Sequence, residues 1–287
     1  MTKLSITRAW NETAEILKRD AGALFIIAFA LIALPQVIYQ ALAPQDPSAE
    51  PGAGGALLML ALVGTILVLS IAGSIAISAL ALGRERVVGS AIALGFRRSL
   101  SLFGASLLIG LVFLVIGVPL MLLTGMDPQA LRPDASPGGG GVAVGFLILL
   151  ILGLALWVRF MLMTPAAADS PGGSVALIRR SWHLTKGHSL RLIGFILLMI
   201  IAGMAVVLAI TAVAGIIVSI ALGTPQPGSL GTVILLLVGG VVNAVFLMVL
   251  TTMVARIYTQ LGGGAPVNAS SPADDAAATG NDNASGI

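Results

Sequence analysis

The sequence contains no cysteine and little charge. With no cysteine among its 287 residues, a disulfide framework, a thiolate nucleophile and a sulfur-ligated metal are excluded. Lys, Arg, Asp and Glu make up only 9% of the chain, whereas roughly 25% is usual in soluble domains. Apolar residues make up 57%. A soluble domain is therefore excluded, and we expect a membrane protein.

Long apolar segments occupy most of the chain. Each is at least as long as the ~20 residues that an α-helix needs to cross a ~30 Å hydrocarbon layer. The segments cover residues 21–43, 56–82, 101–125, 142–168, 192–222 and 229–257. They predict an all-α polytopic membrane protein with six transmembrane helices, which form a single membrane domain over residues 1–261.

The two ends of the chain need separate interpretation. Ala41-Leu42-Ala43 resembles a signal-peptidase site, but the length of the first segment and the charges of both signs before it predict an uncleaved helix. From residue 262 onward the chain consists mainly of small and polar residues. This composition predicts a disordered cytoplasmic tail over residues 262–287.

The basic residues fall on one side of the predicted membrane. When the six spans are laid in order, all of the fifteen lysines and arginines except Arg132 lie at the same side. The loops of the opposite side are rich in proline and glycine and are nearly free of basic residues. Because short cytoplasmic loops carry an excess of Lys and Arg, we expect both termini in the cytoplasm.

Amphipathic segments precede the first, third and fifth spans. In residues 175–186, Leu177, Ser181 and Trp182 lie on one half of a helical wheel and the cations lie on the other. Such a helix cannot span a membrane, but it can lie in the interface. Residues 6–19 and 87–100 show the same construction. The apolar stripe expected in the second of these consists of Val88, Ile92, Phe96 and Leu100.

Two of the amphipathic segments also share a short motif. "GSAIALGFRRSLSLFG" and "GSVALIRRSWHLTKG" both place Arg-Arg-Ser near the end of the amphipathic stretch. This similarity predicts a threefold repeat of one unit, an interfacial amphipathic helix followed by a transmembrane hairpin.

The amphipathic segments supply the candidate binding residues. A cation near an anionic membrane surface contributes on the order of 1 kcal/mol, and tryptophan suits the headgroup depth. The candidate lipid-headgroup contacts are Arg97, Arg98, Arg179, Arg180, Trp182 and Lys186. Membrane lipids, anionic ones above all, are the expected partners, and nucleic acid is not. A protein partner or a homo-oligomer is left open.

Polar residues within the spans are few. Asn243, midway along the sixth span, and Arg159, near the basic end of the fourth, are the candidate intramembrane polar residues. A buried asparagine typically joins helices, and an arginine near a helix end extends to the interface. The lack of membrane carboxylates argues against a pump coupled to protons or sodium.

We assign no catalytic, cofactor-binding or metal-binding residue. His183 and His188 are five residues apart, which is neither the i, i+3 nor the i, i+4 spacing that places two ligands on one helix face. The serines do not form the Gly-x-Ser-x-Gly elbow, and the glycine-rich runs lack the lysine of a phosphate loop. We therefore expect no cofactor.

One stretch of the chain resembles a known family. Pro165, Asp169, "VALIRRSWHLTKG" and Arg191 follow one another between two spans. This order resembles bacterial six-span proteins named for the membrane domain of glycerophosphoryl diester phosphodiesterase. The resemblance implies a module of the bacterial cytoplasmic (inner) membrane. In family members that are enzymes, the activity resides in a separate soluble domain, and no such domain is present in this sequence.

These observations leave three functions to compare. The leading hypothesis is a non-catalytic, lipid-contacting scaffold or accessory module. The alternative is a transporter or lipid translocase, which a cavity lined by Asn243 and the Ser and Thr residues of the fifth and sixth spans would favour. The third is a membrane enzyme of phospholipid or glycerophosphodiester metabolism, which would require Asp169, His183 and His188 to converge.

Overall fold

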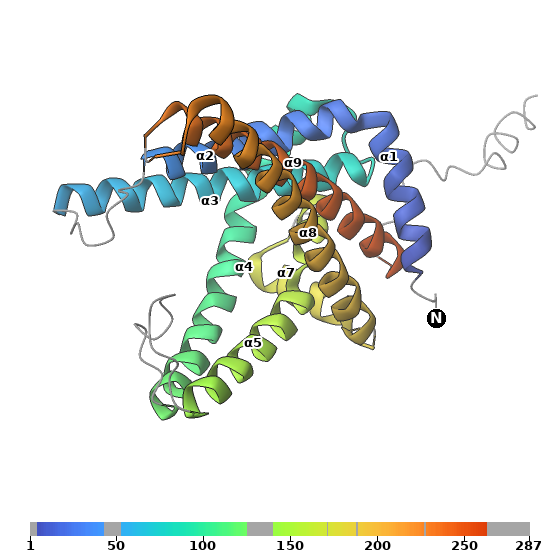
Figure 1. Cartoon of the computed structure of the whole chain (residues 1–287). Coiled ribbons are helices and arrows are strands. Elements are labelled where there is room, and N and C mark those ends of the chain that lie inside the picture. The colour runs from blue at the N-terminus through green and yellow to red at the C-terminus, as the bar shows by residue number, and fades with distance from the viewer. Residues whose placement is uncertain are drawn as a thin grey trace, which may run out of the picture.

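The computed structural model describes residues 5–42, 53–124, 140–170, 172–187, 189–226 and 228–262. Every regular element in these residues is helical, which confirms the all-α class (Figure 1). The elements in order are α1 Ile6–Ile27, a π-helical stretch η1 Ala28–Ala33, α2 Leu34–Leu42, α3 Ala53–Ala81, α4 Val88–Leu123, α5 Gly140–Phe160, α6 Met163–Asp169, α7 Ser174–Thr185, α8 Ser189–Leu222 and α9 Leu230–Gln260.

Six helical segments are long and apolar enough to cross a membrane, as the sequence predicts. They are Ile6–Leu42, Leu57–Ala81, Val88–Leu123, Val142–Asp169, Arg191–Leu222 and Leu230–Gln260. The first of them joins α1, η1 and α2 into one continuous span. The predicted tail from residue 263 onward lies outside the described residues, as do Arg132 and His188.

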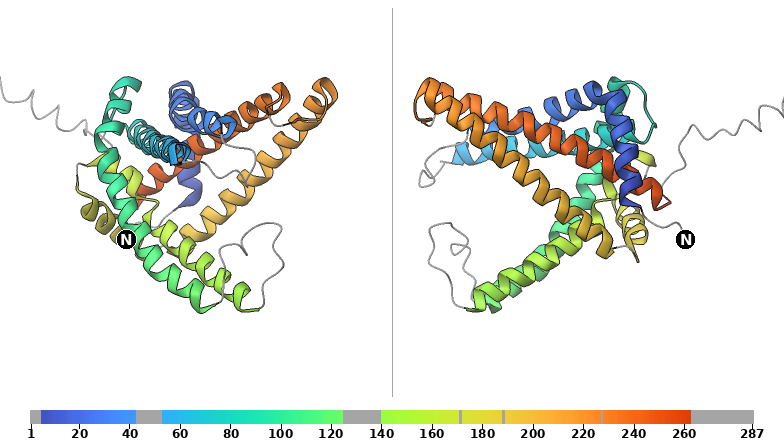
Figure 2. Two further views of the ribbon diagram at one scale, coloured as in Figure 1. Left: turned by 90° about the vertical axis from the view of Figure 1, so that its left-hand side faces the viewer. Right: turned by 45° about the vertical axis from the view of Figure 1, so that its right-hand side comes forward.

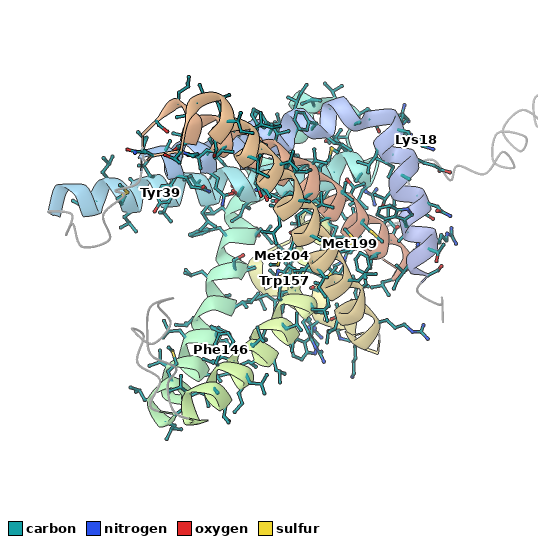
Figure 3. All side chains as sticks on the ribbon, in the orientation of Figure 1. Lys18, Tyr39, Phe146, Trp157, Met199 and Met204 are labelled. Atoms are coloured by element: carbon teal, nitrogen blue, oxygen red, sulfur yellow. The ribbon has the colours of Figure 1, made fainter. Side chains whose placement is uncertain are left out.

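The spans form three hairpins that diverge from a common end. The hairpins are α1–η1–α2 with α3, α4 with α5, and α8 with α9, and their tips point in different directions (Figures 1 and 2). We call the shared end the basic end, because the described arginines of the interhelical turns lie there. Figure 3 places Lys18 at this end, and Tyr39 and Phe146 on two of the diverging arms.

The buried core is concentrated at the basic end. Fully buried side chains come from the last turns of α3 and α9, from α6, from the first turns of α8 and from the end of α1, including Leu24, Ile75 and Tyr258. Farther from this end, large apolar side chains such as Leu114 and Leu198 are exposed. Apolar exposure of this extent suits lipid and not water.

Helices α3 and α4 approach most closely at a glycine. A Cβ added to Gly95 would lie far inside contact distance of the backbone carbonyl oxygen of Ala72. Ala91 and Ser99, one turn away on either side, are buried on the same face of α4. Small residues along one face therefore let the two backbones meet.

This face of α4 differs from the predicted apolar stripe. Of Val88, Ile92, Phe96 and Leu100, the last two are exposed, and Leu100 is 78% exposed; the first two are half-buried. The predicted apolar stripe is therefore not the face on which α4 packs against α3. In a membrane the largest apolar side chains can face lipid, so hydrophobicity alone does not identify the packed side.

The third of the predicted amphipathic segments forms a separate helix. There α7 ends at Thr185, and Gly187, with φ of +89°, turns the chain toward α8. The second segment is instead the beginning of α4 and continues into the span. The first belongs to α1 and is set off by non-helical backbone angles at Asp20. An amphipathic segment is thus set off from the following span where the backbone leaves the helical conformation, at Gly187 and at Asp20, and is continuous with the span where it does not, as in α4.

All three amphipathic segments nevertheless bury a comparable stripe. Each stripe contains a small or hydroxyl-bearing residue and follows the three- to four-residue spacing of one helix face. The stripes are Ala9, Thr13 and Ile16; Ala91, Gly95 and Ser99; and Leu177, Ser181 and Thr185. This packing is consistent with the predicted repeat.

Candidate functional site

A short helix, α6, places an acidic residue at the centre of the basic end. Pro165 lies in its first turn, where the missing N–H costs no hydrogen bond. The helix ends at Asp169 because Ser170, which is extended with φ of −136° and ψ of 144°, precedes a proline in the sequence. Asp169 is therefore fixed at the terminus of the fourth span.

Asp169 binds residues from three other parts of the chain. Its side chain is only 5% exposed and pairs with Arg84 and Arg180. Arg180 Nη2 lies 2.7 Å from its Oδ2 atom, and the Tyr258 hydroxyl donates a hydrogen bond of 2.9 Å to the same atom. We call these four residues the Asp169 cluster. It joins the turn after α3, the end of α6, helix α7 and helix α9.

A glycine turn delivers Arg84 to this cluster. Gly83 has φ of +69°, and the N–H of Arg84 donates to the carbonyl of Ala79 at 3.0 Å. The N–H of Gly83 donates to the carbonyl of Leu80, which completes a Schellman cap at the end of α3. The sequence Leu-Gly-Arg thus ends the second span and directs the arginine into the protein.

The two Arg-Arg-Ser motifs both bind the end of α6. Arg98 Nη1 donates to the carbonyls of Ala167 at 2.6 Å and Ala168 at 3.0 Å. Arg180 of the second motif reaches Asp169 and also Ser170. A cation at the last carbonyls of a helix is favourable, because these groups have no intrahelical partner. The second arginine of each motif therefore has an internal role.

The six predicted headgroup contacts thus divide into two groups. Arg98 and Arg180 turn inward and bind the protein itself. The exposed members are Arg97, Arg179, Lys186 and Trp182. The helical wheel separates polar from apolar sides of α4 and α7, but it contains no information that part of the polar side meets α6. The sequence-based expectation placed all four arginines at the headgroups, whereas in the structure Arg98 and Arg180 bind partners within the protein.

The two predicted intramembrane polar residues lie apart. Arg159 is half-buried at the end of α5, and its guanidinium carbon lies 4.0 Å from the ring centre of Trp182. The Ser181 hydroxyl donates to the carbonyl of Arg159 at 2.6 Å, which fastens α7 to α5. Asn243 is half-buried in the middle of α9. Arg159 therefore belongs to the basic end, whereas Asn243 does not.

An open cavity of about 580 Å³ lies beside the Asp169 cluster, among α3, α4, α5 and α6. A smaller cleft of about 150 Å³ adjoins it and extends toward α8 and α9. Trp157 lines both spaces, and Figure 3 shows this residue near the middle of the molecule, where α5 approaches α8. Most side chains that line the larger cavity are apolar, and four lining residues bear hydroxyl groups: Ser70, Ser74, Ser106 and Thr164.

The cavity is not the one that a translocase was expected to have. The sequence-based hypothesis required Asn243 and the hydroxyl residues of the fifth and sixth spans. The larger cavity is lined by the second, third and fourth spans, and Asn243 is not among its lining residues. No sequence signal predicts this cavity, because serines in an apolar helix do not reveal which neighbours they face.

The convergence expected of a membrane enzyme is not present in the described residues. His183 is exposed on α7, and the partners of Asp169 are arginines and a tyrosine. His188 lies outside the residues that the structure describes. Within those residues, no three His, Cys, Asp or Glu side chains are grouped so that they could hold a metal ion.

Sequence reasoning did not identify Arg84 or Tyr258 as site residues. Arg84 could have been found, because a Leu-Gly-Arg sequence at the end of a span is typical of a Schellman cap. Tyr258 gave no comparable signal, since it lies within the apolar pattern of α9, 89 residues from its partner Asp169.

The Tyr258 hydroxyl provides a limited test of the cluster. Tyr258→Phe removes one hydrogen bond to a carboxylate and leaves both arginines in place, so we expect a loss of about 1.5 kcal/mol in the free energy of unfolding. Denaturant titration of the purified protein in detergent measures this loss. Tyr39→Phe is the control, since Tyr39 lies on α2 on a diverging arm (Figure 3). Equal stability of the two variants would contradict a hydrogen-bonding role.

Comparison with known proteins identifies a family. The family model described as "Domain of unknown function (DUF7847)" matches residues 4–261, which is nearly the whole described chain. No curated protein and no solved structure matches. The description of the matching family does not mention the phosphodiesterase membrane domain, so that resemblance stays a prediction.

Proposed function

Since the chain belongs to the DUF7847 family, whose function is unknown, we propose from the geometry of the basic end that the protein is a non-catalytic, lipid-contacting scaffold. In this proposal the basic end lies at the cytoplasmic face of a bacterial inner membrane. The exposed cations bind anionic headgroups there, and the inward-facing arginines hold the three hairpins together.

The observation that supports this proposal most strongly is the different placement of the two arginines in each Arg-Arg-Ser motif. In both motifs the second arginine binds the end of α6 and the serine is buried. In both, the first arginine, Arg97 or Arg179, is exposed. Exposed apolar side chains lie close by on the same helices, including Leu100 and Trp182. Cations beside exposed apolar residues are typical of a membrane interface.

A non-catalytic role agrees with how Asp169 is bonded. Its Oδ1 atom is held by Arg84, and its Oδ2 atom by Arg180 and Tyr258. A general base needs an oxygen that can reach the proton of a substrate. Both carboxylate oxygens of Asp169 are instead committed to bonds within the protein, which suits a residue that joins structural elements.

Exchange of the two exposed arginines tests the headgroup proposal. We expect the wild-type protein to unfold at a higher temperature in nanodiscs with anionic phosphatidylglycerol than in nanodiscs with zwitterionic phosphatidylcholine. In the double variant Arg97→Gln, Arg179→Gln this difference should shrink, because each cation contributes on the order of 1 kcal/mol near an anionic surface.

The matched control keeps the charges. The variant Arg97→Lys, Arg179→Lys retains both cations and should retain the preference for anionic lipid. If wild type and the glutamine variant show the same difference between the two lipids, the proposed headgroup contact is refuted.

The cavity does not favour a translocase over a scaffold. A translocase requires a path that leads from one membrane surface to the other. The lining residues of the larger cavity extend from Met163 and Thr164 of α6 to Gly110 and Phe113, well inside the third span. A hollow that extends from the basic end into the spans, without lining residues from the far ends of the helices, suits a bound lipid better than a path across the membrane.

A further inference from the structure

Two glycines produce the hollow beside the Asp169 cluster. Gly110 of α4 and Gly153 of α5 both line the cavity of about 580 Å³. A Cβ added at Gly110 would meet nothing within 4 Å, and one at Gly153 would meet only the Phe113 ring, at 3.7 Å. The space at these positions is therefore not needed for contact between the helices, and the backbone is kept bare where a ligand could lie.

We propose that this cavity binds one hydrocarbon chain of an anionic membrane lipid. Its volume is within the range of about 300–1,000 Å³ that is usual for small-molecule sites. It is open and is bounded by helices that are long and apolar enough to span a membrane, and in this proposal its mouth faces lipid hydrocarbon. The adjoining cleft, which shares Trp157 and Met161 with it, offers the chain further room toward α8.

Two of the four hydroxyl groups in the cavity wall, those of Ser74 and Ser106, are paired within their own helices. The Ser74 hydroxyl donates to the carbonyl of Ser70 at 2.8 Å, and the Ser106 hydroxyl donates to the carbonyl of Leu102 at 3.0 Å. Hydroxyls that bond to the preceding helical turn place no unpaired donor in the cavity. No charged residue is among the lining residues that the structure describes. The walls therefore suit a hydrocarbon chain.

The position of the nearest charges selects an anionic headgroup. Leu102 and Thr164 line the cavity and lie about one helical turn from Arg98 and from Ala167, its hydrogen-bond partner. The arginines around this point are Arg84, Arg97, Arg98 and Arg180, and the carboxylates are Asp169 and Glu85. Four positive groups against two negative ones leave an excess of two positive charges. A lipid with its chain in the cavity thus has its phosphate near this excess.

The test uses photoactivatable lipid and the full-length chain in nanodiscs. The probe is phosphatidylglycerol with a diazirine on one acyl chain, and the labelled peptides are identified by mass spectrometry. In the wild type, we expect label to concentrate on the segments that line the cavity, around Met161 and Ile109. Gly110→Phe should reduce this labelling roughly tenfold, because the ring displaces about two methylenes of the chain.

A matched glycine gives the control. A Cβ added at Gly215 of α8 would also meet nothing within 4 Å, and this residue does not line the cavity, so Gly215→Phe adds the same ring elsewhere in the membrane region. It should leave cavity labelling unchanged. Gly153→Leu is the second filling variant and should also lower the labelling, which keeps the test informative if Gly110→Phe does not fold. Label spread over all spans, with no response to either filling variant, would show that only bulk lipid surrounds the protein.

A second probe distinguishes this inference from the proposed function. The preference for an anionic headgroup rests on the proposed function, whereas the binding of a hydrocarbon chain in the cavity does not. The same diazirine chain on phosphatidylcholine serves as the second probe. Equal cavity labelling by both lipids would retain the chain site and overturn the anionic preference. Absence of cavity labelling by both would overturn the chain site, while the effect of Arg97 and Arg179 on stability in anionic nanodiscs would still be measured independently.

Discussion

Asp169→Asn is expected to lower the free energy of unfolding by about 3–5 kcal/mol, the usual cost of removing one partner from a buried ion pair. The carboxylate is nearly inaccessible and neutralises Arg84 and Arg180, which are themselves only about one-third exposed. Asparagine has nearly the same shape but no charge, so the variant leaves two half-buried guanidinium groups facing each other without a counter-ion. Because the Asp169 cluster joins the turn after α3, the end of α6, helix α7 and helix α9, we expect the basic end to loosen as a whole.

The exposed pair of Arg19 and Asp20 supplies the control for this variant. Its N–O distance of 2.8 Å is similar, but its arginine side chain is 70% exposed. Surface pairs contribute only about 0–1 kcal/mol, so Asp20→Asn should change stability little. Denaturant titration in detergent, followed by circular dichroism, measures both variants. If Asp169→Asn costs no more than Asp20→Asn, the Asp169 cluster does not hold the hairpins together.

Gly95→Ala is expected to cost about 3 kcal/mol, the upper part of the usual range for overpacking. The added methyl group would overlap the backbone carbonyl of Ala72. A flexible side chain could rotate away, but a backbone oxygen within helix α3 cannot. The two helices must therefore separate at their closest approach, and the packing of the Ala91 and Ser99 turns is lost as well.

Gly89→Ala provides the matched control on the same helix. A Cβ at this position meets nothing within 4 Å. Alanine favours the helical state over glycine by up to about 1 kcal/mol, so Gly89→Ala should be neutral or slightly stabilising. The comparison of both variants by thermal unfolding in detergent isolates the steric effect. A stable Gly95→Ala protein would mean that α3 and α4 can move apart at little cost.

Both predictions concern the basic end. Side-chain hydrogen bonds join distant parts of the described chain there, such as those of Asp169, Arg98 and Ser181. The tips of the hairpins diverge (Figure 2) and expose apolar side chains. The parts of the helices that pack against several neighbours form two buried clusters, one next to the Asp169 cluster and one around the end of α1 and η1. A scaffold built in this way keeps its cation-bearing surface fixed and leaves the remaining apolar surface to lipid.

The sequence by itself determined the class of protein and the course of the chain. Apolar segments of sufficient length predicted all six spans, because a helix must satisfy its backbone hydrogen bonds internally in hydrocarbon. The distribution of Lys and Arg indicated which ends of the helices lie together. Of the three predicted amphipathic helices only the third is a separate helix, and its end after Thr185 follows from a local signal, the glycine at position 187.

Only the tertiary structure decided which residues form the candidate site. Asp169 meets Arg84 and Tyr258 across separations of 85 and 89 residues, and no local pattern encodes such contacts. It also decided that Arg98 and Arg180 turn inward while their neighbours Arg97 and Arg179 stay exposed. The physical reason is that lipid and protein interior are similarly apolar, so the hydrophobic pattern shows that a helix crosses the membrane but not which of its faces packs against another helix.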